Sequence, residues 1–130
     1  MTTSPLCVAV VDDDPSLCRS LGRLLRAAGM QAVTYSSAEA FLADRKQPRF
    51  DCLVLDVRLG GMSGIDLAMW LNAEGATEPF IFVTAYEDAE TRARAESVGC
   101  SAYFRKTDSG DEVLDAIRRV AGSTTNWRPH

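Results

Sequence analysis

The sequence predicts an α/β fold in which one parallel sheet is covered by helices on both faces. Short, continuous apolar runs at residues 6–11, 52–55 and 80–83 have the length and composition of strands buried on both faces. Stretches with helical spacing of apolar residues separate these runs, and most of them are followed by a glycine. Five strands that alternate with five helices in this way predict a three-layer α/β sandwich.

The first strand and helix are the clearest. The apolar run at residues 6–11 leads into an acidic turn, where Asp14 and Pro15 predict a helix start. Aspartate is a good N-cap, and proline fits the first helical turn. We expect this helix to end at Gly29 and a short second strand to cover residues 31–35.

The remaining elements have similar boundaries. A capping box at residues 36–39 predicts the second helix, and another at residues 109–112 predicts the last one. The fourth helix, expected over residues 88–98, has few large apolar side chains. The final strand is short, at residues 102–104, and is followed by basic side chains.

Length and charge narrow the class of protein. The 130 residues suit one domain, which we place at residues 1–122, with residues 123–130 as a flexible tail or the start of a linker. The net charge of −4 and the pI near 4.9 predict neither a nucleic-acid contact nor a membrane contact by this chain. Neither a membrane-length apolar run nor a signal peptide is recognisable, so we expect a cytoplasmic protein.

The cysteines and the histidine do not indicate a catalytic or metal site. Cys7, Cys18, Cys52 and Cys100 form no C-x-x-C pair and sit beside apolar or small residues, which predicts buried free thiols, with disulfides as the minor alternative. His130 is the only histidine and the last residue. A histidine-based metal site or hydrolase triad is therefore not expected.

Polar side chains stand where the predicted strands end. They are Asp12, Asp13, Asp56, Thr84 and Lys106. Ligands of open parallel sheets bind outside the carboxyl ends of the strands, so we expect these side chains to share one rim.

The chemistry of this set favours phosphoryl transfer. Converging carboxylates repel one another unless a cation lies among them, and oxygen ligands without His or Cys select Mg²⁺. A lysine and a threonine hydroxyl can stabilise the equatorial oxygens of a phosphoryl group. The sequence has no G-x-x-x-x-G-K-[ST] loop to hold a nucleotide, which indicates that another protein or a small donor supplies the phosphoryl group.

These residues resemble the receiver domain of two-component response regulators over residues 6–121. The resemblance rests on Val-Val-Asp-Asp-Asp-Pro at 10–15, on Leu-Asp-Val-Arg-Leu-Gly-Gly-Met-Ser-Gly at 55–64, and on the spacing to Thr84-Ala85 and Lys106. It is strongest to receivers that precede a LuxR-type helix-turn-helix domain. The resemblance implies a flavodoxin-like (βα)5 fold with strand order 2-1-3-4-5.

The resemblance also implies a phosphoacceptor and a metal site. Asp56 would accept a phosphoryl group from a histidine kinase or a phosphotransfer protein. Asp13, Asp56 and the backbone carbonyl of Arg58 would ligate Mg²⁺, with Asp12 acting through water. The chain would then be a signalling domain that catalyses only its own phosphorylation and dephosphorylation.

Further roles follow from the same resemblance. Thr84 would be the switch hydroxyl, Lys106 would pair with a phosphoryl oxygen, and Tyr103 would be the aromatic side chain that reorients with them. Arg58 and Tyr86 lie where the family sets the lifetime of the aspartyl phosphate. The fourth helix, fifth strand and fifth helix would form a phosphorylation-dependent homodimer surface.

The sequence departs from the family pattern at two positions. Thr107 replaces the usual proline after Lys106, which makes a cis peptide at that position costlier. Gly60 replaces the usual proline in the loop after Asp56, so we expect a more mobile loop.

Two alternatives remain open from the residues. One is a receiver-like interaction module that is never phosphorylated. The other is a haloacid-dehalogenase-type phosphatase with Asp12 as its nucleophile, although its late acidic pair is absent and Asp56 would have no role in it.

Overall fold

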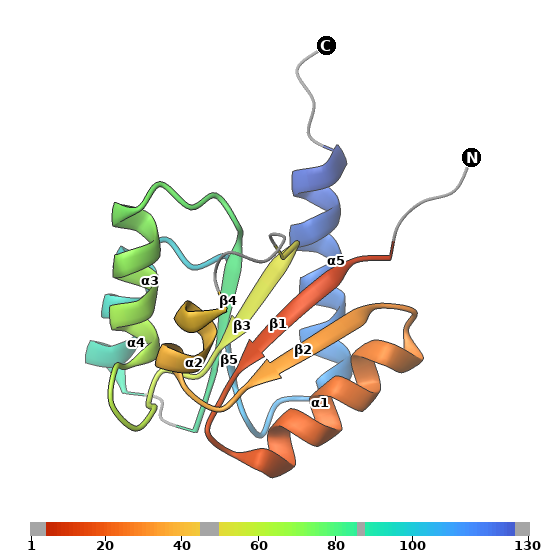
Figure 1. Ribbon diagram of the computed structural model, residues 1–130, viewed down its shortest axis with the longest axis horizontal. Helices are drawn as coiled ribbons and strands as arrows, with labels where there is room; N and C mark the ends of the chain where they lie inside the picture. The colour runs from red at the N-terminus through yellow and green to blue at the C-terminus, as the bar shows by residue number, and fades with distance from the viewer. Residues whose placement is uncertain (1–4, 45–49, 86–87, 127–130) are drawn as a thin grey trace.

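The computed structural model describes residues 5–44, 50–85 and 88–126, and within them it confirms the predicted three-layer fold. One parallel sheet has the strand order β2-β1-β3-β4-β5 (Figure 1). The strands are β1 Cys7–Val11, β2 Gln31–Tyr35, β3 Cys52–Leu55, β4 Phe80–Thr84 and β5 Ala102–Arg105. The helices are α1 Pro15–Ala27, α2 Ala38–Ala43, α3 Gly64–Ala73, α4 Ala89–Ser97 and α5 Gly110–Asn126.

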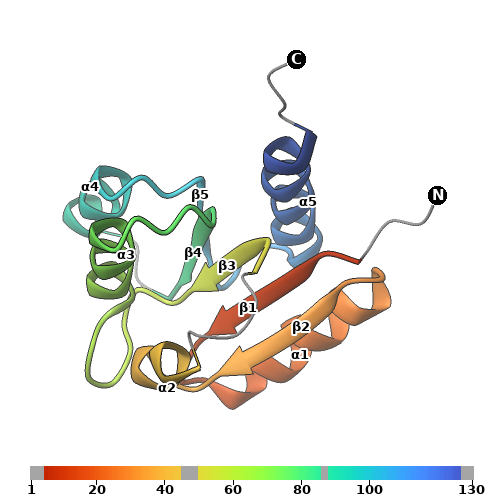
Figure 2. The same ribbon diagram turned by 45° about the horizontal axis from the view of Figure 1, so that its top comes forward.

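Helices cover both faces of the sheet, as Figure 2 shows from a second direction. Two layers of apolar side chains pack between the helices and the sheet. Because side chains alternate along a strand, Val8 and Val10 of β1 enter one layer and Ala9 and Val11 enter the other. The first layer also contains buried side chains of α1 and α5, and the second contains those of α2, α3 and α4. Strands β1, β3 and β4 are therefore buried on both faces, which explains their continuous apolar runs.

The boundaries of α1 confirm both of its predicted caps. Asp14 caps α1 through bonds from the Ser16 and Leu17 N–H groups, and Pro15 is the first helical residue. Gly29 follows α1 with a φ of 85°, a conformation that glycine adopts without strain.

The predicted capping box of α2 is wrong in detail. Ser37 is the N-cap and accepts from the Ala40 N–H group. The Glu39 carboxylate instead accepts from the Met62 N–H group at 3.0 Å, in the loop between β3 and α3. A long-range partner has displaced the local one, which a local sequence pattern does not disclose.

The last helix also differs from its predicted length. Helix α5 continues to Asn126, whereas we expected the domain to end at residue 122 and a flexible tail or linker to follow. Ser123 to Asn126 contain no proline, and a single glycine at residue 122 lowers helix stability without ending the helix. The domain boundary itself remains a prediction.

Three smaller expectations can also be compared with the structure. All four cysteines are free thiols, as predicted, but the expected burial is wrong for three of them: only Cys52 is buried, and Cys7, Cys18 and Cys100 are partly exposed. The peptide between Lys106 and Thr107 is trans. Within the described residues, none of the helices combines the length and apolar character that a membrane crossing needs.

Candidate functional site

The carboxyl ends of β1 and β3 place Asp12 and Asp56 side by side. These strands are neighbours, with Val11 opposite Leu55, and the Asp56 N–H group donates to the Val11 carbonyl at 3.0 Å. Both carboxylates are buried, with exposed fractions of 2% for Asp12 and 4% for Asp56. Burial of two like charges is costly unless cations balance them.

Lys106, just after β5, supplies one such cation. Its Nζ lies 3.1 Å from Asp56 Oδ2 and 3.2 Å from Asp12 Oδ1, and it donates to both. Burial alone lowers the pKa of Lys106, but the hydrogen bonds and charges of the two aspartates outweigh this effect and raise it. Lys106 is therefore a charged bridge between three strand ends.

One cation does not neutralise the cluster. Burial, and then the charge of Asp12, raise the pKa of Asp56 to about 6, although Lys106 acts in the opposite direction. Repulsion and lost hydration therefore exceed the attraction of the lysine. The cluster retains an excess of negative charge that a second cation would relieve.

The oxygen atoms offer a place for that cation. Asp12, Asp13 and Asp56 each provide a carboxylate oxygen, and these oxygens all lie within 4.8 Å of one another. Among the described residues, the buried Oδ2 atom of Asp12 has no hydrogen-bond donor, although Lys106 Nζ lies 3.1 Å away. A buried acceptor without a donor and an all-oxygen donor set suit Mg²⁺. Asp13 is exposed, which leaves one side open.

Backbone groups hold both buried aspartates in position. The Asp14 N–H group donates to Asp12 Oδ1 at 2.8 Å, and the Arg58 N–H group donates to Asp56 Oδ1 at 3.3 Å. The Asp14 contact was missed at the sequence level, where Asp14 was assigned only as a helix cap. Aspartate side chains in turns often accept a hydrogen bond from the backbone N–H group two residues further along the chain, and this tendency could have indicated the contact.

A close approach brings the N-terminus of α3 against the chain just after β3. A Cβ atom on Gly64 would lie 2.0 Å from the carbonyl oxygen of Asp56, so no larger residue is accommodated without movement. The Gly64 N–H group donates to the Val57 carbonyl at 2.9 Å. Glycine at this position therefore determines how closely the loop folds over Asp56.

Thr84 and Tyr103 occupy the neighbouring strands. Thr84 ends β4 and is fully buried, and its carbonyl accepts from the Lys106 N–H group at 2.8 Å. Tyr103 of β5 is partly buried, with its ring centroid 6.4 Å from that of Phe82. The guanidinium of Arg92 on α4 lies 5.2 Å from the centre of the Tyr103 ring, a cation–π contact that sequence reasoning missed.

The structure thus gathers the predicted carboxylates and the lysine, and it places Thr84 at the adjoining strand end. Arg58 is exposed beside Asp56. Tyr86, the other residue expected to influence the phosphate lifetime, lies outside the described residues.

Comparison with known proteins identifies a family. The response regulator receiver domain family matches residues 8–118 of this chain. Response regulator protein TmoT of Ectopseudomonas mendocina is 36% identical over 111 residues, which are 85% of this chain and 50% of that protein. Nodulation protein W of Bradyrhizobium diazoefficiens is 38% identical over 110 residues, covering 85% of this chain and 48% of that protein.

Solved structures agree with these matches. The structure titled FixJ-N has a TM-score of 0.83 and 30% identity, and covers 94% of this chain and 96% of that one. The beryllofluoride-activated DrrB receiver domain has a TM-score of 0.80 and 26% identity, and covers 91% of this chain and 98% of that one. The phosphatase alternative finds no support in these comparisons.

The curated relatives are longer than this chain. The chain spans about half the length of the curated relatives it matches. The family match covers nearly all of β1 to α5 and includes all the clustered aspartates. The chain belongs to the response regulator receiver domains, the signalling phosphoacceptors of two-component systems.

Proposed function

We propose that Asp56 is the residue that accepts the phosphoryl group, and that a histidine kinase or a phosphotransfer protein supplies it. The observation that carries this proposal is the position of the Asp56 carboxylate, which lies beside both the acidic cluster and Lys106 Nζ.

Mg²⁺ is the proposed cofactor. Asp13, Asp56 and the backbone carbonyl of Arg58 would hold it, with Asp12 acting through water. When bound, the ion supplies positive charge that offsets the carboxylates and the phosphoryl oxygens. The orphaned Oδ2 atom of Asp12 and the raised pKa of Asp56 support this assignment.

Lys106 and Thr84 are proposed to respond to the new charge. A phosphoryl group on Asp56 offers Lys106 additional acceptors, and the Thr84 hydroxyl would donate to another of its oxygens. Tyr103 would reorient as Thr84 moves, and its contact with Arg92 would carry this change to α4. The surface of α4, β5 and α5 would then form a phosphorylation-dependent homodimer.

Arg58 and Tyr86 are proposed to set the lifetime of the phosphorylated state. Arg58 is exposed on the loop that follows Asp56, where a long cationic side chain can restrict the attacking water. Replacement of both residues by alanine is expected to shorten the lifetime, and an unchanged lifetime would contradict this role.

The output is proposed to be transcriptional control through a LuxR-type helix-turn-helix domain. Relatives support this, because proteins named transcriptional regulatory protein FixJ and TdiR match this chain at 33% and 36% identity. In the chain described here, the receiver itself would make no direct nucleic-acid contact.

The test is intact-mass spectrometry after incubation with acetyl phosphate, with Mg²⁺ or with a chelator. We expect wild type to gain the mass of one phosphoryl group only with Mg²⁺, and Asp56→Asn to gain none. Asp115→Asn, which changes an exposed carboxylate on α5, is the matched control and should react as wild type does.

Other outcomes would redirect the assignment. An adduct that persists in Asp56→Asn and disappears in Asp12→Asn would make Asp12 the acceptor. No adduct with wild type under any condition, including incubation with a phosphorylated phosphotransfer protein, would favour an interaction module that is never phosphorylated.

A further inference from the structure

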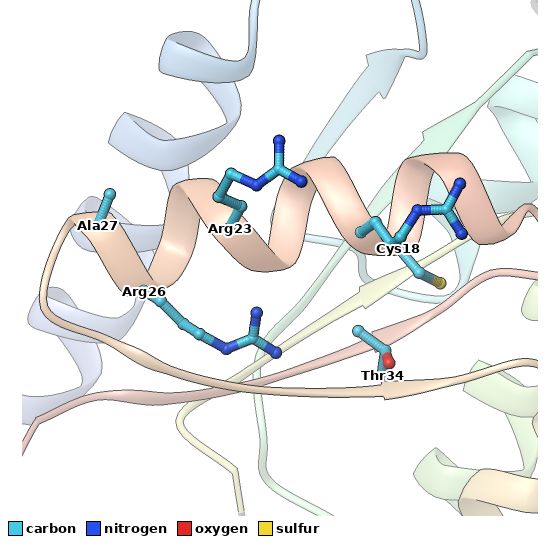
Figure 3. A pocket seen from close by; sticks show the side chains of 6 residues that line it. Cys18, Arg23, Arg26, Ala27 and Thr34 are labelled. Carbon is cyan, nitrogen blue, oxygen red and sulfur yellow. The ribbon is translucent and has the colours of Figure 1, made fainter.

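A polar groove lies between α1 and β2; it does not include the clustered carboxylates, although its lining residue Cys18 donates from Sγ to the Asp12 carbonyl at 3.3 Å. It has a volume of about 560 Å³, and three arginines of α1 line it. Figure 3 shows Arg26 reaching from α1 toward Thr34 of β2. The lining residues are Cys18, Arg19, Arg23, Arg26, Ala27 and Thr34. This basic groove contrasts with the net charge of −4 for the whole chain.

The three guanidinium groups lack acidic partners within the described part of the chain. Helix α1 contains no aspartate or glutamate, and none of the ion pairs involves Arg19, Arg23 or Arg26. Arg26, in the last turn, also complements the helix dipole. Arg19 and Arg23 lie further from that helix end, so the dipole does not account for them. Like charges along one groove favour an anionic occupant.

Strand β2 offers a free backbone edge beside these arginines. In the described sheet its only neighbour is β1. The Gln31 N–H group and the Tyr35 carbonyl face β1, because they bond to Leu6 and Asp12. Backbone direction alternates along a strand, so Ala32 and Thr34 point their backbone groups toward the open edge. An open edge is a template for another extended chain.

The spacing of the arginines suits an extended chain. Four residues of helix separate Arg19 from Arg23 by about 6 Å along the axis, and three separate Arg23 from Arg26 by about 4.5 Å. Alternate side chains of an extended strand are about 6.6–6.8 Å apart. Acidic residues at alternate positions of a strand beside β2 would therefore follow the row of arginines.

We propose that this groove binds an extended acidic segment of a partner protein. The segment would add to β2 as an outer strand and present alternate Asp or Glu side chains to Arg19, Arg23 and Arg26. A peptide is favoured over a small anion or duplex DNA because only a peptide backbone uses the open edge of β2. Contact with the arginines supplies the charge complementarity and the bidentate hydrogen bonds.

The charge dependence is tested by fluorescence anisotropy with a labelled peptide in which glutamate alternates with valine and threonine. The double variant Arg19→Gln/Arg23→Gln is compared with Arg118→Gln/Arg119→Gln, which removes the same charge from α5 outside the groove. We expect the groove variant to raise the dissociation constant about fivefold or more and the control less than about twofold. An equal effect of both variants would show nonspecific attraction and overturn the proposal.

The backbone dependence needs a second peptide of the same sequence, N-methylated at alternate positions. We expect it to bind about tenfold more weakly, because it cannot pair with the edge of β2. Unchanged affinity would overturn the strand addition. Displacement of the parent peptide by inorganic phosphate, or tighter arginine-dependent binding of duplex DNA, would likewise overturn it in favour of a simple anion site or a nucleic-acid site. Circular dichroism and retained phosphorylation by acetyl phosphate would verify that the variants are folded.

Discussion

At the scale of single residues, the surroundings of Asp56 disfavour the ionised form of its carboxylate. Its carboxylate is 4% exposed and lies beside that of Asp12. Burial and the charge of Asp12 raise its pKa to about 6, even though Lys106 lowers it. The ionised Asp56 side chain therefore lowers the stability of the metal-free protein, a cost that suits its proposed role as phosphoacceptor. Its isosteric amide should reveal that cost.

Asp56→Asn is expected to stabilise the metal-free protein at neutral pH by about 2 kcal/mol, because the amide removes the repulsion with Asp12. Urea unfolding in the presence of a chelator measures the change. Asp13→Asn, at the exposed member of the same cluster, should have a smaller effect. A less stable Asp56→Asn protein would mean that its bond to Lys106 outweighs the repulsion.

A second residue predicts a pH dependence far from the cluster. The Tyr35 hydroxyl donates to Asp44 Oδ2 at 2.6 Å. Burial, and then the hydrogen bond to Asp44, raise the pKa of Tyr35 from 10.0 to about 12. The neutral phenol is thus favoured in the folded state, and its contribution is complete below pH 10 and is lost as pH rises through about 12.

Tyr35→Phe is expected to lower the free energy of unfolding by about 1 kcal/mol at neutral pH, since a hydrogen bond is lost. The difference between wild type and the variant should then shrink as pH rises from 10 to about 12. Urea unfolding at a series of alkaline pH values measures both curves. Curves that stay parallel would contradict the link between this phenol and stability.

At the scale of elements, the start of α3 controls how the loop after β3 folds over Asp56. The capping box of Ser63 and Asp66 fixes the first turn of α3, and Gly64 brings it against the Asp56 carbonyl. Glu39 of α2 holds the far side of the same loop through Met62. The loop that contains Gly60 is therefore held at two points, by the start of α3 and by the bond between Glu39 and Met62.

Gly64→Ala is expected to lower the free energy of unfolding by at least about 2 kcal/mol, because its Cβ would lie 2.0 Å from a backbone oxygen. Gly60→Ala is the matched control, since a Cβ there meets no atom within 4 Å. The control should change stability by less than about 0.5 kcal/mol. Equal costs in the two variants would show that the close approach is not limiting.

At the scale of the whole molecule, Lys106 joins strand ends that are far apart in the sequence. Its bonds reach Asp12 and Asp56, which lie 94 and 50 residues away along the chain. Without a metal ion this lysine is the cation that faces both buried carboxylates. Global stability should therefore depend on it.

Lys106→Met is expected to cost about 3 kcal/mol in the presence of a chelator, since two buried carboxylates lose their cation. Mg²⁺ should raise the unfolding midpoint of this variant more than that of wild type, because the ion then balances the cluster alone. Chemical unfolding with and without Mg²⁺ compares the two shifts. Arg119→Met, at an exposed site on α5, should leave both stability and the metal response unchanged. Equal Mg²⁺ shifts would contradict the competition between lysine and metal.

Much of this molecule was predictable because its signals are local. A strand buried on both faces must be continuously apolar, so β1, β3 and β4 were recognisable along with the polar residues that end them. Parallel topology then brings those ends to one edge whatever the details of packing. The association of Asp12, Asp56 and Lys106 followed from these two facts.

Other features depend on contacts between distant segments, which a local pattern does not contain. Glu39 bonds to Met62, 23 residues away, instead of completing its own capping box. The arginines of α1 form a groove only because that helix packs beside the edge strand β2. Net charge sums over the chain, whereas the packing of α1 on the sheet determines where the charges meet.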